Sequence, residues 1–303
     1  MSGSLLEIKK KIGGVQNTRK ITKAMQLVAA SKMQRFQKRA VKAREYVWDL
    51  LEILKSNLNE DSNSIFTQKR ETGKTLFVLY TSDKGLCGSL NTKLINCLFR
   101  SDKWNKLAED ERLLITVGKK SHGYAMSNKI PVEKDFIGIP EQLSNLDAIK
   151  VIDSIFDLWK NGDVKEVIFV APHYKNSFTT YPVMKSFLPF TGKTVKDTLG
   201  VDEDLVPEEK EENDNKFMYF APSEEIVLER LYEQVIQSMF IQSFLELKAA
   251  EYSSRMIAMQ NATDSANRMI GDLKRVFNKA RQQAITQEIA ELIGASMALE
   301  GSN

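Results

Sequence analysis

With 303 residues, 42% of them hydrophobic, the chain is long enough for one or two domains with a real core. A formal net charge of +3 is too small to indicate nucleic-acid binding by itself, and two cysteines are too few for a disulfide scaffold. No apolar run reaches the roughly 18–20 residues of a membrane span, and the first residues resemble neither a secretory signal nor a transit peptide, so we expect a soluble protein that meets a membrane only through partners.

Residues 1–60 are predicted to form one long helix. The segment has no proline, and apolar or small residues recur in steps of three and four, as in a helix that packs along a partner helix. This seam comprises Ala29, Met33, Phe36, Ala40, Ala43, Val47, Leu50, Leu54 and Leu58.

The same helix is strongly basic. Up to Arg44 it contains twelve Lys or Arg residues and one acid, Glu7. Three interpretations are open: a solvated charged face, an arm that follows nucleic-acid phosphates, and a helix that runs inside an acidic protein cavity. In a basic-zipper protein the basic block precedes the zipper, whereas here the charges are interleaved with the seam, which disfavours the second interpretation.

Residues 73–200 change in character and predict an α/β domain. Buried-strand runs alternate with helical stretches, which favours a parallel sheet with crossover helices. The expected strands are 76–80, 113–117, 167–170 and 178–188, and the expected helices are 89–100, 119–128 and 148–160.

After an acidic linker at 201–220, residues 221–303 predict a second long helix. Its seam comprises Leu245, Ala249, Tyr252, Met256, Met259, Thr263, Ala266, Ile270, Leu273, Phe277, Ala280 and Ala284. Two long helices with narrow seams at opposite ends of one chain can pair as an antiparallel coiled coil. Because the first helix is shorter, the far end of the second should protrude or meet another partner.

No reaction site emerges from the motifs. Gly73-Lys74-Thr75 and Gly192-Lys193-Thr194 each resemble the end of a phosphate-binding loop. The glycine that this loop needs five residues earlier is replaced by Gln68 in one and by Phe187 in the other. Both matches are therefore weak and more typical of turns.

The turn from Ser82 to Asn91 is the most unusual stretch of the middle region. It follows a strand and opens a helix, which is where open α/β sheets bind ligands. Cys87 paired with His122 or His173 is conceivable as nucleophile and base, although nothing local supports the pairing. A nucleotide-binding or hydrolytic enzyme with coiled-coil arms remains an alternative, with this turn as its site.

Three separated motifs resemble one family. The stretch from Ile12 to Met33 resembles the N-terminal helix of the γ-subunit family of F-type ATP synthases, and residues 82–91 are similar to that family's turn after the first central strand. Residues 278–291 are similar to its C-terminal motif. One departure is that two residues, where the family usually has three, separate Glu291 from the following Gly-Ala pair.

The resemblance implies a fold and a role. The fold is an antiparallel coiled coil of the N- and C-terminal helices with an inserted Rossmann-like α/β domain. The role is that of a central-stalk rotor, which couples ion-driven rotation of a membrane c-ring to ATP synthesis or hydrolysis at β-subunit sites. The implied partners are the hexameric ring of α and β subunits, the ε subunit and the c-ring, at the cytoplasmic face of a bacterial cell membrane. No active site, cofactor or metal in this chain is implied.

The resemblance also carries roles to single positions. Rotor–stator contacts are implied for Met25, Lys32, Arg35, Lys38, Arg281, Gln282, Thr286 and Glu288, and foot contacts with ε or the c-ring for Arg44 and Tyr46. A cation in place of Met25 is expected to disturb coupling. Arg281 is expected to meet a carboxylate of a β subunit, since a guanidinium can bind a carboxylate in bidentate fashion.

Overall fold

The computed structural model describes residues 2–56, 64–140, 145–176, 179–190, 221 and 223–300. The expected linker at 201–220, together with Leu58 and Gly192, lies outside these residues. The described chain divides into two units, of which the first combines residues 1–29 with 256–303 and the second comprises residues 30–255.

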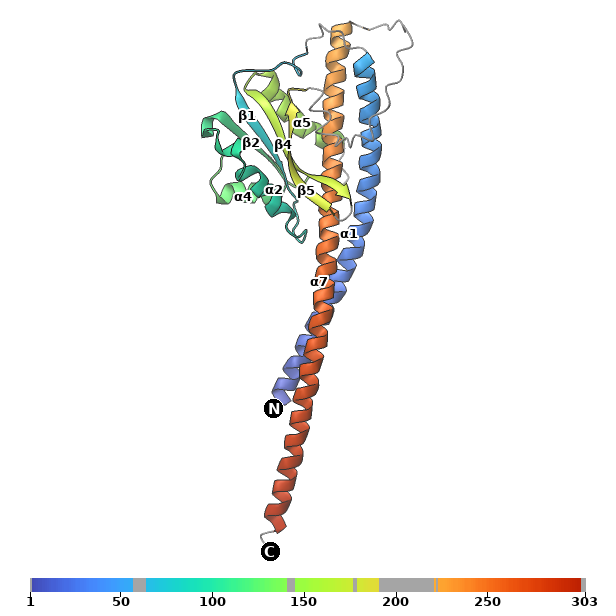
Figure 1. Cartoon of the computed structure of the whole chain (residues 1–303), viewed down its shortest axis with the longest axis vertical. Coiled ribbons are helices and arrows are strands. Elements are labelled where there is room, and N and C mark those ends of the chain that lie inside the picture. The colour runs from blue at the N-terminus through green and yellow to red at the C-terminus, as the bar shows by residue number, and fades with distance from the viewer. Residues whose placement is uncertain are drawn as a thin grey trace. The chain divides into compact units, whose positions relative to one another are not determined.

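Two long helices contribute to both units. Helix α1 spans Ser2–Ser56 and helix α7 spans Glu224–Glu300. The two helices run antiparallel (Figure 1). In α1, the seam residues Ala29, Met33, Phe36, Ala40, Val47, Leu50 and Leu54 are buried. The predicted pairing of two terminal helices is confirmed, because their three- and four-residue spacing keeps one narrow apolar face turned inwards.

The second unit contains a five-stranded sheet with the order β3-β2-β1-β4-β5. Its strands are β1 (Lys74–Tyr80), β2 (Arg112–Val117), β3 (Lys134–Phe136), β4 (Val164–Asn176) and β5 (Thr179–Leu188). Strands β1 to β4 run parallel to one another, and β5 pairs antiparallel with β4. The predicted α/β fold is confirmed. Strand β3 escaped prediction because it is three residues long and its burial is slight.

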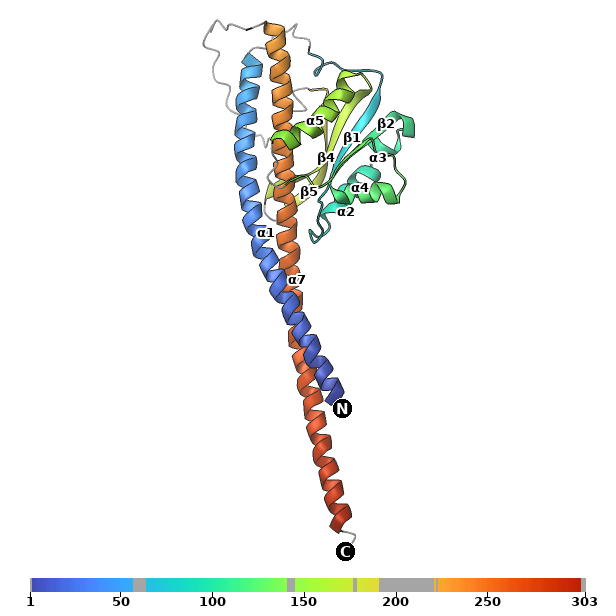
Figure 2. The same cartoon turned by 180° about the vertical axis from the view of Figure 1, so that it is seen from behind.

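Helices cover both faces of this sheet (Figures 1 and 2). On one face, α2 (Leu90–Phe99) and α4 (Lys119–Ser127) pack with Phe77 and Leu79 of β1. The opposite face, marked by Leu76 and Val78, packs against α5 (Asn145–Lys160) and against α1 and α7. The short helices α3 (Asp102–Asn105) and η1 (Glu109–Glu111) lie between α2 and β2 in the chain. Alternate residues of one strand therefore serve two separate cores, as the two-residue period of a strand requires.

In the second unit, α7 is enclosed on almost all sides. Residues 244–253 are all buried, including the charged Glu246, Lys248 and Glu251. This enclosure arises because α1 packs on one side of α7 and the α/β domain packs on another. A two-helix coil alone leaves most of each helix surface in water.

Candidate functional site

Polar side chains fix the register of the two helices in the first unit. Arg19 donates to Asn267 (Nη1–Oδ1, 3.2 Å), and the hydroxyls of Thr22 and Thr263 lie 2.8 Å apart with both side chains buried. The amides of Gln26 and Gln260 are joined at 3.1 Å. The numbers in each pair add to 285 or 286, so Ser2 comes level with about residue 284 of α7. The last turns of α7 therefore continue beyond the start of α1, as Figure 1 shows.

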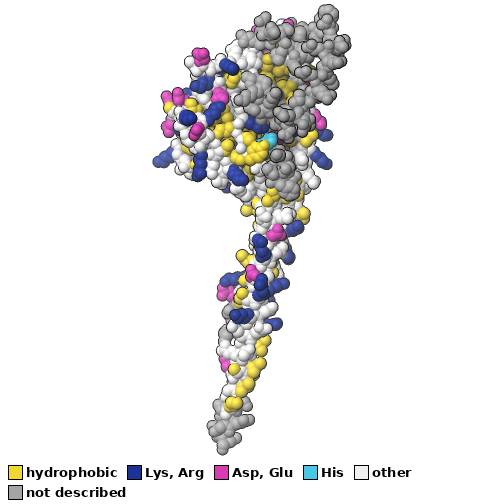
Figure 3. Space-filling model, in the orientation of Figure 1, with side chains coloured by type: hydrophobic (Ala, Val, Ile, Leu, Met, Phe, Trp, Pro, Cys, Tyr) yellow, Lys and Arg dark blue, Asp and Glu magenta, His cyan; other side chains and the backbone are white. Residues whose placement is uncertain are grey.

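These last turns carry an exposed apolar stripe. The large apolar side chains Ile285, Ile289, Leu292, Ile293 and Met297 are 47–71% exposed. At about 100° per residue, most of them share one side of the helix. Figure 3 shows a line of hydrophobic side chains along this end of α7. A stripe of this kind is typical of a surface that another chain covers.

The C-terminal residues with implied contact roles lie on or beside this stripe. By the same helical geometry, Arg281 and Glu288 lie at one edge of it, and Gln282 and Thr286 fall in line with Ile293 and Met297. All four are exposed. The Thr286 hydroxyl donates to the Gln282 carbonyl at 2.9 Å. In the same unit, Met25 is half-buried on α1.

The other implied residues lie on α1 in the second unit, and three of them contact side chains of this chain. Lys32 Nζ lies 5.3 Å from the Tyr252 ring centroid and 3.5 Å from its hydroxyl. Arg44 Nη2 pairs with Glu246 Oε1 at 2.6 Å, and the Tyr46 hydroxyl accepts from Gln234 Nε2 at 3.3 Å.

Arg35 and Lys38, on the same segment, are exposed. The Arg35 guanidinium lies 5.4 Å from the ring centroid of the neighbouring Phe36. Apart from Met25, which lies on α1 of the first unit, the implied residues fall into two groups, one beside the stripe and one on α1 of the second unit.

The turn after β1 is closed by its own side chains. Cys87 is buried, with Sγ 3.1 Å from Asn91 Nδ2 and 3.6 Å from Ser82 Oγ. The thiol thus sits between an amide and a hydroxyl, neither of which is a general base. Asp83 accepts from the backbone N–H of Lys119 at 2.9 Å, which ties the turn to the start of α4.

The phosphate-loop motif at Gly73 has a different role. A phosphate-binding loop follows a strand and opens a helix, whereas Gly73 precedes β1. Glycine is needed here because φ is +118° and a Cβ would lie only 3.0–3.1 Å from the backbone of Val164 and Lys165. The motif marks a tight turn, as its weak match indicated.

A cluster of charges on α7 was not predicted from the sequence. Arg255 Nη2 pairs with Glu251 Oε1 at 2.7 Å, and Lys248 Nζ pairs with Glu251 Oε2 at 3.1 Å. All three are at most 7% exposed. The sequence offers one signal: these charged residues stand in a stretch of alanine and aromatic residues. The helical period alone, however, places them on the solvated face of the helix.

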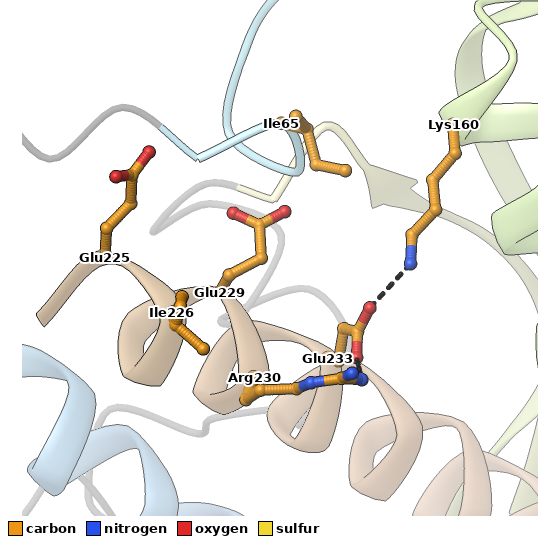
Figure 4. Close-up of a pocket in the computed structure, with 7 residues that line it drawn as sticks. All are labelled: Ile65, Lys160, Glu225, Ile226, Glu229, Arg230 and Glu233. Atoms are coloured by element: carbon orange, nitrogen blue, oxygen red, sulfur yellow. Dashed lines mark hydrogen bonds and ion pairs between the residues drawn. The ribbon is translucent and has the colours of Figure 1, made fainter. Parts of the chain in front are cut away.

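A shallow cavity of about 680 Å³ lies beside the first turns of α7 (Figure 4). Glu229 and Glu233, one turn apart, line it with opposite pKa shifts. Burial raises the pKa of Glu229. Burial acts in the same direction on Glu233, but hydrogen bonds and charges from Lys160 and Arg230 outweigh it and hold its pKa below the ordinary value. The salt bridges of Glu233 measure 2.6 Å to Lys160 and 2.7 Å to Arg230.

Within the part of the chain that the structure describes, no three His, Cys, Asp or Glu side chains are grouped to hold a metal ion. No helix of that part is long and apolar enough to cross a membrane. The geometry defines a coiled-coil protein with an inserted α/β domain, whose exposed helical end offers a contact surface.

Comparison with known proteins identifies the family. A family model described as ATP synthase matches residues 4–299. An ATP synthase gamma chain of Polynucleobacter asymbioticus is 33% identical over 298 residues, covering 98% of this chain and 99% of the relative. One of Heliobacterium modesticaldum is 31% identical over 295 residues, covering 97% and 98%. The chain belongs to the ATP synthase gamma-chain family.

Solved structures agree in fold. The central stalk and c-ring structure of Tetrahymena thermophila mitochondrial ATP synthase contains a chain with a TM-score of 0.56 and 25% identity, covering 80% of this chain and 99% of that one. A chain of the Euglena gracilis mitochondrial ATP synthase has a TM-score of 0.68 at 16% identity, covering 100% and 96%. The protein is thus a subunit of an ATP synthase complex, with the central-stalk role of its family.

Proposed function

We propose that this chain is the shaft that transmits rotation between a membrane c-ring and the catalytic β subunits, and that it has no active site of its own. The observation that carries the proposal is the apolar stripe at 285–297, which lies beyond the start of α1. A shaft that turns inside a ring of α and β subunits needs such an end: apolar enough to be enclosed, yet without a fixed polar lock at one orientation.

The residues beside the stripe supply the specific contacts in this proposal. Arg281, Gln282, Thr286 and Glu288 meet loops of the β subunits, and Met25 faces the ring from α1. A guanidinium at an interface pairs well with a carboxylate. Lys32, Arg35 and Lys38 give α1 a positive side that acidic stator loops attract without locking.

The same proposal assigns the other end of the coil to the foot. Arg44 and Tyr46 lie on the segment of α1 that would approach the ε subunit and the c-ring. Their contacts with Glu246 and Gln234 make them part of the coil as well. The protein would then work as a peripheral subunit at the cytoplasmic face of a bacterial cell membrane.

Reconstitution tests this function. The full-length chain is mixed with α and β subunits, the complex is isolated by size exclusion, and ATP hydrolysis is measured. We expect one copy per ring, activity that depends on this chain, and a loss of roughly tenfold in Arg281→Ala, the effect of a charged interface contact worth ~1.4 kcal/mol.

Arg275→Ala is the matched control. Arg275 is an exposed arginine on the same helix, but its guanidinium already pairs with Asp272 at 2.7 Å. We expect activity close to that of the unchanged chain. A chain that stays free while α and β assemble with another gamma chain would refute the proposal, and equal losses in both variants would refute the specific role of Arg281.

A further inference from the structure

Arg255 occupies an unusual position among the charged residues of α7. It is 7% exposed and is the last residue of α7 in the second unit. An ion buried to this depth is costly unless it is paired and hydrogen-bonded. Glu251 supplies one partner, at 2.7 Å.

The same nitrogen of Arg255, Nη2, together with Nε, also reaches the turn after β1. Its Nη2 and Nε lie 3.3 Å from the Gly85 carbonyl, and Nη2 lies 3.3 Å from the Lys84 carbonyl. The guanidinium thus joins a carboxylate on α7 to two backbone carbonyls of the α/β domain. Only a planar fork with several donors can make such a set of bonds, which a lysine cannot reproduce.

The contacts continue to the other long helix. The Arg255 guanidinium lies 5.0 Å from the centroid of the Tyr252 ring. That ring stacks on Phe36 of α1, with centroids 5.6 Å apart and planes 6° from parallel. Turn, α7 and α1 are therefore joined through one continuous set of packed side chains.

The turn requires such support. Leu86 has a φ of 63° and a side chain that is 59% exposed. A bulky residue in the left-handed region is strained, and persists there only when its surroundings over-determine the backbone. The two carbonyls that Arg255 holds belong to the residues immediately before Leu86. The hydroxyl of Ser82 also donates to the Lys84 carbonyl, at 2.7 Å.

We propose that Arg255 is a positioning residue that clamps the turn of residues 82–91 onto α7, so that the α/β domain and the two helices beside it move as one body. The clamp keeps Leu86 in its left-handed conformation and Cys87 covered. Its part in coupling rests on the proposed shaft function, whereas its hold on the turn does not.

Thiol labelling of the full-length chain tests the hold on the turn. Cys87 is 2% exposed and reports opening of the turn, and Cys97 of α2 is the internal reference. Labelling is followed for each cysteine by peptide mass spectrometry. In Arg255→Gln we expect Cys87 to react on the order of tenfold faster, because the turn opens locally, with Cys97 unchanged.

Lys248→Gln is the matched control. Lys248 has the same burial as Arg255 and pairs with the same carboxylate, but its ammonium is bonded to Glu251 and not to the turn. Lys248→Gln should leave the labelling rates of both cysteines within about twofold of those in the unchanged chain, because the turn does not open locally. Arg255→Lys, which keeps the charge and the pair with Glu251, should give an intermediate Cys87 rate. Equal acceleration in the Gln variants, or no acceleration in Arg255→Gln, would overturn the clamp.

The assembled complex tests the positioning role. ATP hydrolysis and ATP-driven ion pumping are measured on the same membranes. Arg255→Gln should lower the number of ions pumped per ATP hydrolysed by about twofold or more, because the α/β domain and the two helices would no longer move as one body and part of the rotation would not be transmitted. Lys248→Gln should leave this ratio unchanged. An unchanged ratio in Arg255→Gln would overturn the part in coupling. If the unaltered chain failed to assemble, the proposed shaft function would be refuted, and the labelling result would still test whether Arg255 holds the turn.

Discussion

The ion pair between Arg44 of α1 and Glu246 of α7 offers a quantitative test of how the coil is held. Arg44 Nη2 lies 2.6 Å from Glu246 Oε1, and the same oxygen accepts from Gln242 Nε2 at 2.7 Å. The Glu246 side chain is 5% exposed and that of Arg44 is 29% exposed. The carboxylate is therefore the buried partner, and the guanidinium is partly in water.

This asymmetry sets the expected magnitudes. Breaking a buried pair by removing one partner costs about 3–5 kcal/mol, and Arg44→Met should fall near the lower end, at about 3 kcal/mol, because water already screens part of the guanidinium. Glu246→Met should cost about 1–2 kcal/mol, since the arginine left behind can turn to solvent. The double variant should cost less than about 1 kcal/mol, because two methionines fill the space without a buried charge. The coupling energy is then at least about 3 kcal/mol.

Urea denaturation followed by circular dichroism, on the full-length chain at pH 7, gives the four free energies of unfolding for this cycle. Single-variant costs that add to within about 0.5 kcal/mol in the double variant would refute the reasoning, because additive effects mean that the pair contributes no interaction. The same series separates two roles of Arg44. If it serves only a partner at the foot, Arg44→Met will weaken assembly and leave the stability of the chain unchanged.

Two further predictions concern the cavity carboxylates and a tight turn. Because the pKa of Glu233 is depressed, its contribution to stability is present at pH 7 and is lost as the pH falls through that lowered value; Glu233→Gln should destabilise the chain at pH 7, and this effect should fade as the pH is lowered through that value. The pKa of Glu229 is raised, so Glu229→Gln should stabilise the chain at pH 7, with the gain vanishing near pH 4, and denaturation midpoints against pH that move in the same direction for both variants would contradict this. Gly118→Ala should cost at least about 2 kcal/mol, because φ is +100° and a Cβ would lie 2.1 Å from the Thr81 carbonyl oxygen. Gly123→Ala, in α4 with open space around it, should stabilise by up to about 1 kcal/mol in the same urea denaturation assay, and similar effects of the two substitutions would count against this account.

The parts of the fold that the sequence predicts are those governed by a period. Most of the α1 seam, and the α7 seam up to Ile270 except Met256, are buried where the three- and four-residue spacing places them, since one face of a long helix must find a partner. The strands of the sheet core are equally evident, because they are continuous apolar runs. In both cases the local pattern and the tertiary environment agree.

The charged core around Glu251 follows from tertiary structure alone. The α/β domain closes over a side of α7 that a two-helix coil would leave in water, so residues of the expected polar face become buried. The local sequence of α7 does not indicate which of its residues the α/β domain will cover. The bond from Arg255 to the Gly85 carbonyl spans 170 positions, and the acceptor is a backbone atom that any residue possesses.

The register of the coil connects the polar pairs of the first unit to the contact surface at the end of α7. Thr22 and Thr263 are buried opposite each other in a seam that is otherwise small and apolar, where a slip of one heptad would cost little in hydrophobic burial. A buried polar pair disfavours that slip, because the hydrogen bond between the two hydroxyls would be lost and each would keep only the carbonyl of its own helix, Arg19 for Thr22 and Met259 for Thr263. The pair therefore determines how far α7 continues beyond α1, and with it which apolar side chains are left for another chain to cover. The buried threonine pair and the exposed stripe are thus linked: the pair fixes the register of the coil, and the register fixes the length of α7 that is available to act on other subunits.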